Sequence, residues 1–201
     1  MTLTQQRPAE AAGTARRAMI DSQLRTSGVN EPWVLAAMAR VAREDFVPAE
    51  ARAAAYIDRA IPLGNGRYLA APLVHARMLA EAAPTPQDRA LLVGDADGYL
   101  AALLRPLAGS LDCVTPAGAA SAKGKKDAYS LILIDGAVEQ LPAALAAQLA
   151  GDGRLVTGLA ERGVTRLATG RKVAGELVLL PLTEIGIPLL AEFAAPKGWK
   201  F

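Results

Sequence analysis

A chain of 201 residues is long enough for one domain with a full hydrophobic core and a small appendage. Its net charge of +2, with both signs interspersed, gives no basic stripe and argues against nucleic-acid binding. The single cysteine, Cys113, excludes an internal disulfide and a multi-cysteine metal site, so we expect no metal. No apolar run reaches membrane-spanning length and the N-terminus lacks an apolar signal region, so we expect a soluble, cytoplasmic protein.

The first part of the chain reads as helical. Polar residues without periodicity predict a flexible N-terminus over residues 1–13. Apolar spacing then predicts a helix from Thr14, and a second helix that Asn30 caps and that carries Pro32 in its first turn. Because proline disfavours helix in the residue before it, we expect this second helix to end at Pro48.

Three further elements complete the predicted helical region of residues 14–86. A short alanine-rich helix runs from Glu50 to about Tyr56. Asn65-Gly66 then marks a turn or an irregular hairpin, because these residues favour the left-handed backbone of tight turns. An amphipathic helix follows over residues 73–82.

Residues 87–201 carry the pattern of an α/β domain, and we expect the whole chain to form a single compact unit. The stretch Ala90–Leu104, ALLVGDADGYLAALL, reads as a strand, a glycine-containing turn and a helix. The remaining predictions are strands at 111–115, 129–134 and 154–159, an exposed loop at 116–127, a helix at 142–149, and an antiparallel pair at 164–169 and 176–182.

The turn after the first strand is the candidate ligand-binding element. Gly94 and Gly98 suit a tight turn that backbone groups use to approach a nucleotide. Ala96 stands where such a loop usually has another glycine, and Asp95 and Asp97 are expected to cap the following helix. A strand-to-helix turn that keeps its glycines for geometry alone is the alternative.

Several runs together resemble the protein-L-isoaspartate (D-aspartate) O-methyltransferases. They are REDFVP at 43–48, AYIDRAIPLG at 55–64, the turn described above, and AEFAAPKGWKF at 191–201. The resemblance implies a three-layer Rossmann-like S-adenosylmethionine-dependent methyltransferase fold that methylates damaged aspartyl residues of proteins. It places the cofactor loop at Gly94, Asp95, Ala96, Asp97, Gly98 and Tyr99.

The chain departs from the family where the chemistry takes place. Ala70 stands at the position of a family serine in the active site, and Leu92 at the position of a family acidic residue. The acid that fixes the cofactor's ribose has only Thr115 or Pro116 as its nearest equivalent. The interval before the strand at residue 129 is short, which predicts that one βα unit of the family is deleted and the sheet shortened.

Three other residues are pocket candidates. His75, the only histidine, could carry a proton, but no nucleophile is paired with it, and a buried structural histidine is the alternative. Asp135 and Gly136 follow the predicted third strand, at the edge where open α/β sheets bind ligands. A carboxylate that caps the next helix is the competing interpretation of Asp135.

Two hypotheses follow. In the first, the chain is an S-adenosylmethionine-dependent methyltransferase that repairs isoaspartyl residues, as the resemblance implies. In the second, it is a pseudo-methyltransferase that has no intact catalytic residue, has lost the cofactor, and binds a protein or peptide partner or a second copy of itself. The family residues at the cofactor and substrate positions are replaced here by Leu92, Ala96, Thr115 and Ala70. The combined loss of their contacts favours the second hypothesis.

Overall fold

The computed structural model describes residues 3–121 and 124–196. They form two compact units, and the boundary between them lies within one helix, between Ala80 and Glu81. The sequence predicts a single compact unit overall with its internal boundary at residue 86. Each unit is therefore described by itself.

Helical segments make up most of the first unit, and they begin earlier than predicted. Helix α1 starts at Leu3 rather than Thr14, because alanine and other strong helix formers outweigh the missing apolar period. The full set is α1 Leu3–Met19, the π-helix η1 Ile20–Leu24, α2 Pro32–Arg40, and the 3₁₀ helices η2 Arg43–Phe46 and η3 Ala49–Ala54.

Helix α2 confirms one prediction and corrects two. Pro32 lies at its first position, where a missing amide costs nothing. The N-cap residue is Glu31 rather than Asn30, and no side chain makes a capping hydrogen bond. The helix ends at Arg40 and not at Pro48, because the chain turns extended at Val41 before the 3₁₀ helix η2.

A two-stranded hairpin follows in the first unit, as Asn65-Gly66 predicts. Strands β1 (Ile61–Gly64) and β2 (Arg67–Leu69) pair antiparallel. Asn65 has φ 50° and Gly66 has φ 72°, the left-handed conformation that these two residue types tolerate best. Helix α3 (Pro72–Ala82) comes next and includes the boundary between the units.

A six-stranded sheet with the order β4-β3-β5-β6-β7-β8 forms the centre of the second unit. The first four strands pair parallel, and β6, β7 and β8 pair antiparallel, which confirms the predicted C-terminal hairpin. The bounds are β3 Arg89–Val93, β4 Ser110–Val114, β5 Tyr129–Val138, β6 Leu149–Glu161, β7 Val164–Val173 and β8 Glu176–Glu184.

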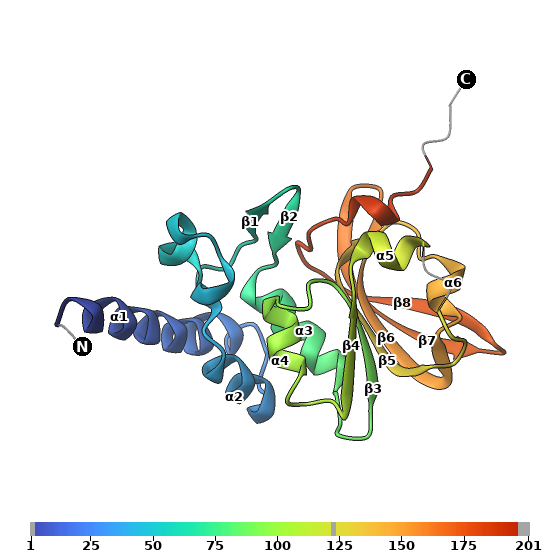
Figure 1. Cartoon of the computed structure of the whole chain (residues 1–201), viewed down its shortest axis with the longest axis horizontal. Helices are drawn as coiled ribbons and strands as arrows, with labels where there is room; N and C mark the ends of the chain where they lie inside the picture. Colours follow the sequence, from blue (N-terminus) through green and yellow to red (C-terminus); the bar gives the residue numbers. More distant parts are fainter. Residues whose placement is uncertain (1–2, 122–123, 197–201) are drawn as a thin grey trace. The chain divides into compact units, whose positions relative to one another are not determined.

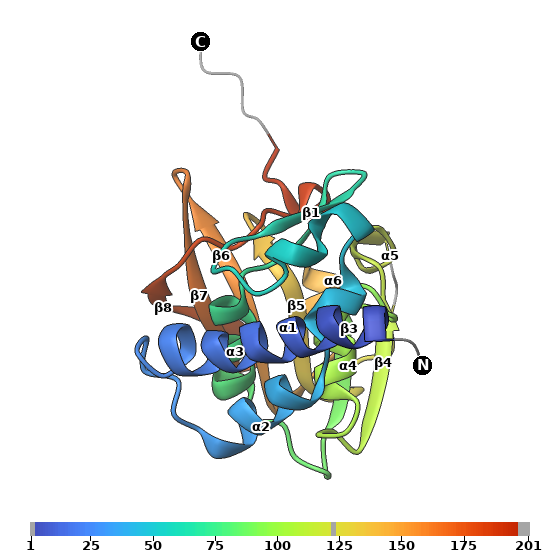
Figure 2. The same ribbon diagram turned by 90° about the vertical axis from the view of Figure 1, so that its left-hand side faces the viewer.

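Helices cover both faces of this sheet, so the second unit has the predicted three layers. Helix α4 (Tyr99–Leu104) lies on one face, and α5 (Pro116–Ser121) and α6 (Ala143–Ala146) lie on the other (Figures 1 and 2). The core on the second face combines β3, β5, β6, α5, α6 and residues near the end of the chain. It includes Leu91, Val93, Ala119, Ile132, Ile134, Leu145, Leu155, Leu190 and Phe193.

The connection from β4 to β5 corrects one prediction and bears on another. Residues 116–121 form helix α5 and not an exposed loop, because alanines favour helix and Ala119 is buried in the core. No strand lies between β4 and β5 among residues 115–121 and 124–128. The sheet therefore lacks a strand at this place, as the short interval predicts.

Both central strands also extend past their predicted ends. β5 continues from Ile134 to Val138, and β6 begins at Leu149, before Gly151-Asp152-Gly153, which the sequence presents as a turn. A segment late in the chain, residues 185–195, supplies part of the reason. Ala137 donates its amide to Pro188 O at 2.7 Å, and Ala137 O accepts the Leu190 amide at 3.0 Å. We call residues 185–195 the strap.

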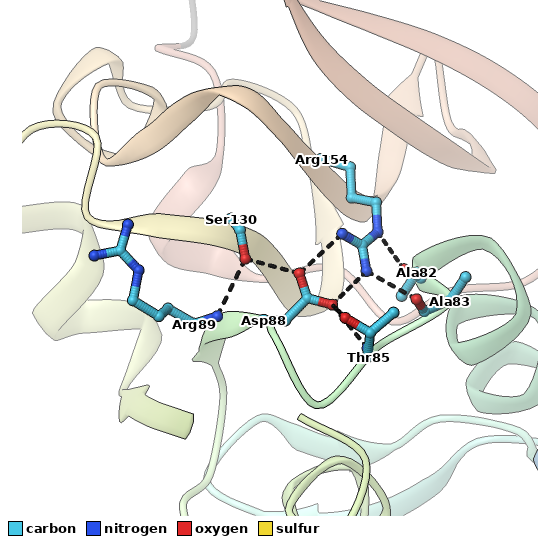
Figure 3. Close-up of polar contacts among 7 residues, drawn as sticks. All are labelled: Ala82, Ala83, Thr85, Asp88, Arg89, Ser130 and Arg154. Atoms are coloured by element: carbon cyan, nitrogen blue, oxygen red, sulfur yellow. Dashed lines mark hydrogen bonds and ion pairs between the residues drawn. The ribbon is translucent and has the colours of Figure 1, made fainter. Parts of the chain in front are cut away.

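An ion pair connects residues at the amino ends of the parallel strands. Arg154 on β6 and Asp88 before β3 form a two-pronged pair, with Nη2–Oδ2 at 2.8 Å and Nη1–Oδ1 at 3.1 Å (Figure 3). Ser130 on β5 donates to Asp88 Oδ1 at 2.7 Å, and the Thr85 amide donates to Oδ2 at 2.8 Å. Arg154 also donates to the carbonyl oxygens of Ala82 and Ala83. The cluster thus ties two neighbouring strands to the loop that enters β3.

Candidate functional site

The candidate site lies at the carboxyl end of β3, where the chain order in the sheet reverses. β4 is the neighbour of β3 on one side and β5 on the other, which is the switch point at which open α/β sheets bind ligands. Gly94 follows β3, and its amide donates to Val114 O at 2.9 Å. A Cβ atom at Gly94 would lie 3.1 Å from Asp135 Cβ, so the structure brings the predicted Gly94 and Asp135 together.

The loop after Gly94 is held by its own backbone. Asp95 Oδ1 accepts the Asp97 amide at 3.0 Å, and Asp95 O accepts the Gly98 amide at 3.1 Å. Gly98 is the N-cap residue of α4 and no side chain caps the helix, so the predicted capping role of both aspartates is wrong. Asp95 prefers its local turn because an Asp side chain readily bonds the amide two residues on.

The two ends of the loop differ in exposure. Asp95, Ala96 and Asp97 are exposed, whereas Tyr99, at the start of α4, is buried. Arg105 at the end of α4 donates to Ala96 O at 2.6 Å and so ties the loop back to its helix. The exposed side chains that a ligand would meet here are two carboxylates and a methyl group.

The end of β4 offers no carboxylate among the described residues. Thr115 follows β4, and its Oγ1 accepts the Gly118 amide at 3.1 Å. Pro116, which has no amide hydrogen, starts α5 immediately. The Thr115 hydroxyl therefore serves as a cap for α5. No carboxylate of the described residues is available at this place to make a charge-assisted hydrogen bond to ribose hydroxyls.

Apolar side chains fill the space beside the end of β5. Gly136 lies within β5 with φ 156°, and a Cβ atom there would lie 2.5 Å from Leu190 Cγ of the strap. Leu190 and Phe193 join Val93 and Ala119 in one core. Gly136 is thus needed for the close approach of the strap, which corrects its predicted place in a loop after the strand. On the other side of β3, Leu92 is also buried.

His75 lies in the first unit and is fully buried. Its Nδ1 is 3.3 Å from Nη1 of Arg43, and because a guanidinium only donates, Nδ1 accepts this bond. Arg43 also donates to the carbonyl oxygens of Ala55 and Ala70. The structural interpretation of His75 therefore fits these contacts, and Ala70 contributes its backbone to the same cluster.

Arg43 was not among the predicted residues, although it starts the REDFVP run on which the resemblance rests. Its side chain is fully buried and its hydrogen bonds connect η2, η3 and α3 of the first unit. The available signal was its place in a run that is specific to the resemblance, directly after Val41 and Ala42. The REDFVP run therefore contains a residue, Arg43, that holds the interior of the first unit together. The resemblance at this run does not require that it contact a ligand.

Tyr56 is the centre of a second polar cluster in the first unit. Its hydroxyl accepts Nε of Arg16 at 2.7 Å and donates to Oε2 of Glu44, and Arg16 pairs with Glu44 at 3.2 Å. Burial and the hydrogen bond to the Glu44 carboxylate raise the pKa of Tyr56 to about 12. The pKa of Glu44 is lowered, because hydrogen bonds from Tyr56 and Arg16 outweigh its burial.

We expect the phenol of Tyr56 to titrate well above the usual range of a tyrosine. In an ultraviolet pH titration this phenol should ionise near pH 12 in the wild type and be absent in Tyr56→Phe. Glu44→Gln should lower its pKa, because the partner carboxylate is lost. Since the pKa is raised in the folded state, the stabilisation is complete below about pH 10 and is lost as the pH rises towards 12. An unchanged titration in Glu44→Gln would contradict the assignment.

Comparison with known proteins identifies the family. The family model for protein-L-isoaspartate(D-aspartate) O-methyltransferase matches residues 14–115. The Koribacter versatilis protein-L-isoaspartate O-methyltransferase is 34% identical over 187 residues, which cover 81% of this chain and 84% of the relative. The Methanoregula boonei enzyme is 32% identical and covers 74% of this chain and 80% of the relative. The chain belongs to the protein-L-isoaspartate(D-aspartate) O-methyltransferase family.

Solved structures confirm the fold that the family resemblance implies. A Plasmodium falciparum protein-L-isoaspartate O-methyltransferase, in complex with S-adenosyl-L-homocysteine, matches with a TM-score of 0.70 at 17% identity. The match covers 90% of this chain and 98% of that chain. In the described part of this chain, no helix is long and apolar enough to cross a membrane, and no group of three metal-ligating side chains comes together.

Proposed function

We propose that this member of the family does not hold S-adenosylmethionine and serves as a cytoplasmic protein-binding module. The observation that carries the proposal is the end of β4, where Thr115 caps α5 and no carboxylate is available for ribose. The residues present therefore do not fit the cofactor. The buried Leu92 supports the same conclusion. So does the absence of a strand between β4 and β5 among residues 115–121 and 124–128.

The size of the lost contacts supports a loss of binding and not merely a weaker site. Hydrogen bonds to charged groups contribute about 1.5–3 kcal/mol each. Micromolar affinity corresponds to about 8.2 kcal/mol, so the absence of the two family carboxylates, at Leu92 and Thr115, removes about 3–6 kcal/mol of it. Ala70, at the position of the family serine, also offers no hydroxyl for a substrate carboxylate.

A methyltransferase that repairs isoaspartyl residues is the second candidate, because curated relatives with this name cover most of the chain. The placement of Gly94 beside Asp135 favours it, since this corner of the sheet keeps the geometry of a ligand site. Such catalysis consists mostly of positioning a carboxylate against the methyl group, which can survive the loss of one hydroxyl.

Calorimetric titration with S-adenosylmethionine tests the proposal. We expect no binding heat and no thermal shift up to about 1 mM ligand. A dissociation constant of about 1 mM corresponds to a binding free energy of about 4 kcal/mol, so even binding this weak would be seen. Binding at micromolar concentration, or methyl transfer to an isoaspartyl peptide, would overturn the proposal.

A matched variant, Thr115→Asp, tests the position that carries the argument. Thr115 is exposed, and aspartate is at least as good an N-cap as threonine, so α5 should remain intact. Combined with Ala96→Gly, it returns a carboxylate and a loop glycine to the site. A measurable gain of binding in this variant, with none in the wild type, is the result expected if these two positions account for the loss.

A further inference from the structure

Exposed apolar side chains gather on one face of the β7–β8 hairpin. Leu180 is 62% exposed, Val173 61% and Val178 52%. Their neighbours Leu177 and Leu179 point to the opposite face, where they pack against the core of the second unit. β8 therefore buries one face and presents a second apolar face to solvent, although solvent-facing positions of such a strand are normally polar.

The strand pairing shows that two opposite charges lie within this face. Arg171 pairs with Val178, and Val173 pairs with Glu176. Since paired residues and residues two apart point to the same side, these four side chains form a small rectangle with the acid and the base at opposite corners. Among the described residues, neither Arg171 nor Glu176 makes an ion pair.

A rectangle of this kind is complementary to itself. A twofold axis along the diagonal from Val173 to Val178 places Arg171 opposite Glu176 of the second copy, and the reverse pair forms at the same time. The two valines then lie on the axis, and each faces the same valine of the second copy. The strands of the two copies cross at a steep angle, as in orthogonal sheet packing.

The free edge of the sheet is less suited to bind a second copy than this face. β8 is the outer strand, and a second strand would have to pair with it through Pro181, which has no amide hydrogen to donate. Proline on an edge strand is a device that prevents edge-to-edge pairing. The face and not the edge is therefore the surface that is open to a partner.

We infer that the chain forms a homodimer through this face of β7 and β8, which is defined by Arg171, Val173, Glu176, Val178 and Leu180. The second copy is the occupant because it supplies an acid for Arg171, a base for Glu176 and apolar side chains in a single twofold arrangement. The contact does not depend on the proposed loss of the cofactor, since β8 and β4 are the opposite ends of the sheet.

Charge reversal tests the contact. Sedimentation velocity on the full chain, from about 1 to about 100 μM, should show a concentration-dependent dimer in the wild type. Arg171→Glu and Glu176→Arg should each raise the dimer dissociation constant about tenfold or more, because like charges then face each other. The double variant R171E/E176R should restore the wild-type constant to within about threefold, since the pairs form again with their signs exchanged.

Two further variants make the result specific. Val178→Ser should abolish the dimer while the thermal unfolding of the monomer changes little, because this side chain is 52% exposed. Lys125→Glu, an equal charge reversal in the loop before β5, should leave the dimer unchanged. A wild type that is monomeric throughout, or single variants that do not weaken the dimer, would overturn the inference. A double variant that stays as weak as the single ones would also overturn it.

Discussion

Replacing Arg154 by methionine is expected to lower the free energy of unfolding by about 3–5 kcal/mol. The change leaves the Asp88 carboxylate, which is 5% exposed, without its partner, and it removes a donor from the carbonyl oxygens of Ala82 and Ala83. Urea-induced unfolding followed by circular dichroism measures the loss. Arg89→Met is the matched control, because only the backbone of Arg89 joins this cluster, and it should cost less than about 0.5 kcal/mol (Figure 3).

The same cluster should make the protein sensitive to acid. Burial opposes ionisation of Asp88, but hydrogen bonds from Arg154, Ser130 and Thr85 outweigh it and hold its pKa well below the usual 3.8. Because the pKa is lowered in the folded state, this stabilisation is present above about pH 4 and is lost as the pH falls further. Asp88→Asn should flatten the decline in stability below pH 4. An equally steep decline in this variant would assign the acid sensitivity to other carboxylates.

Replacing Arg43 by methionine is the second change with a large expected effect. The fully buried guanidinium satisfies the carbonyl oxygens of Ala55 and Ala70 and the Nδ1 of His75. Leaving buried acceptors unpaired costs about 1–3 kcal/mol each, so we expect a loss of about 3–5 kcal/mol. Arg43→Lys should recover only a part, because one ammonium group cannot reproduce the planar fork of donors.

The control for Arg43 is an arginine in the neighbouring helix. Arg52 on η3 is exposed, and Arg52→Met should change the free energy of unfolding by less than about 0.5 kcal/mol. Differential scanning calorimetry would report the two variants side by side. Equal effects at both positions would show that burial of Arg43 does not set its contribution.

Local chemistry made the first unit's hairpin and the parallel strands predictable. Asn65-Gly66 specifies a tight turn by its backbone preference alone, and an apolar run such as the one ending at Val93 specifies a buried strand. Helix α5 was missed because its glycine and polar neighbours suggest a loop, whereas burial of Ala119 decides the outcome. The continuation of β5 through Gly136 depends on the strap, which no local pattern reveals.

The candidate site was predictable in position but not in its contacts. Gly94 follows an apolar strand, and this order alone places it at the carboxyl end of a sheet. Its proximity to Asp135 depends on β3 and β5 being neighbours, which the sequence order of the strands permits but does not require. The Asp88–Arg154 pair joins residues far apart in the sequence, so only the folded chain identifies it.

The strap gives this fold a fixed order of completion. Ala137, Glu139 and Gln140 at the carboxyl end of β5 receive hydrogen bonds or donate them to residues 188–193, which follow β5 by the length of the whole β6–β8 meander. During synthesis, the end of β5 therefore keeps exposed backbone groups, and β5 and α5 keep exposed apolar side chains, until Leu190 and Phe193 have left the ribosome. Chains interrupted before the strap should be the aggregation-prone species of this protein, and chaperones should bind them longest.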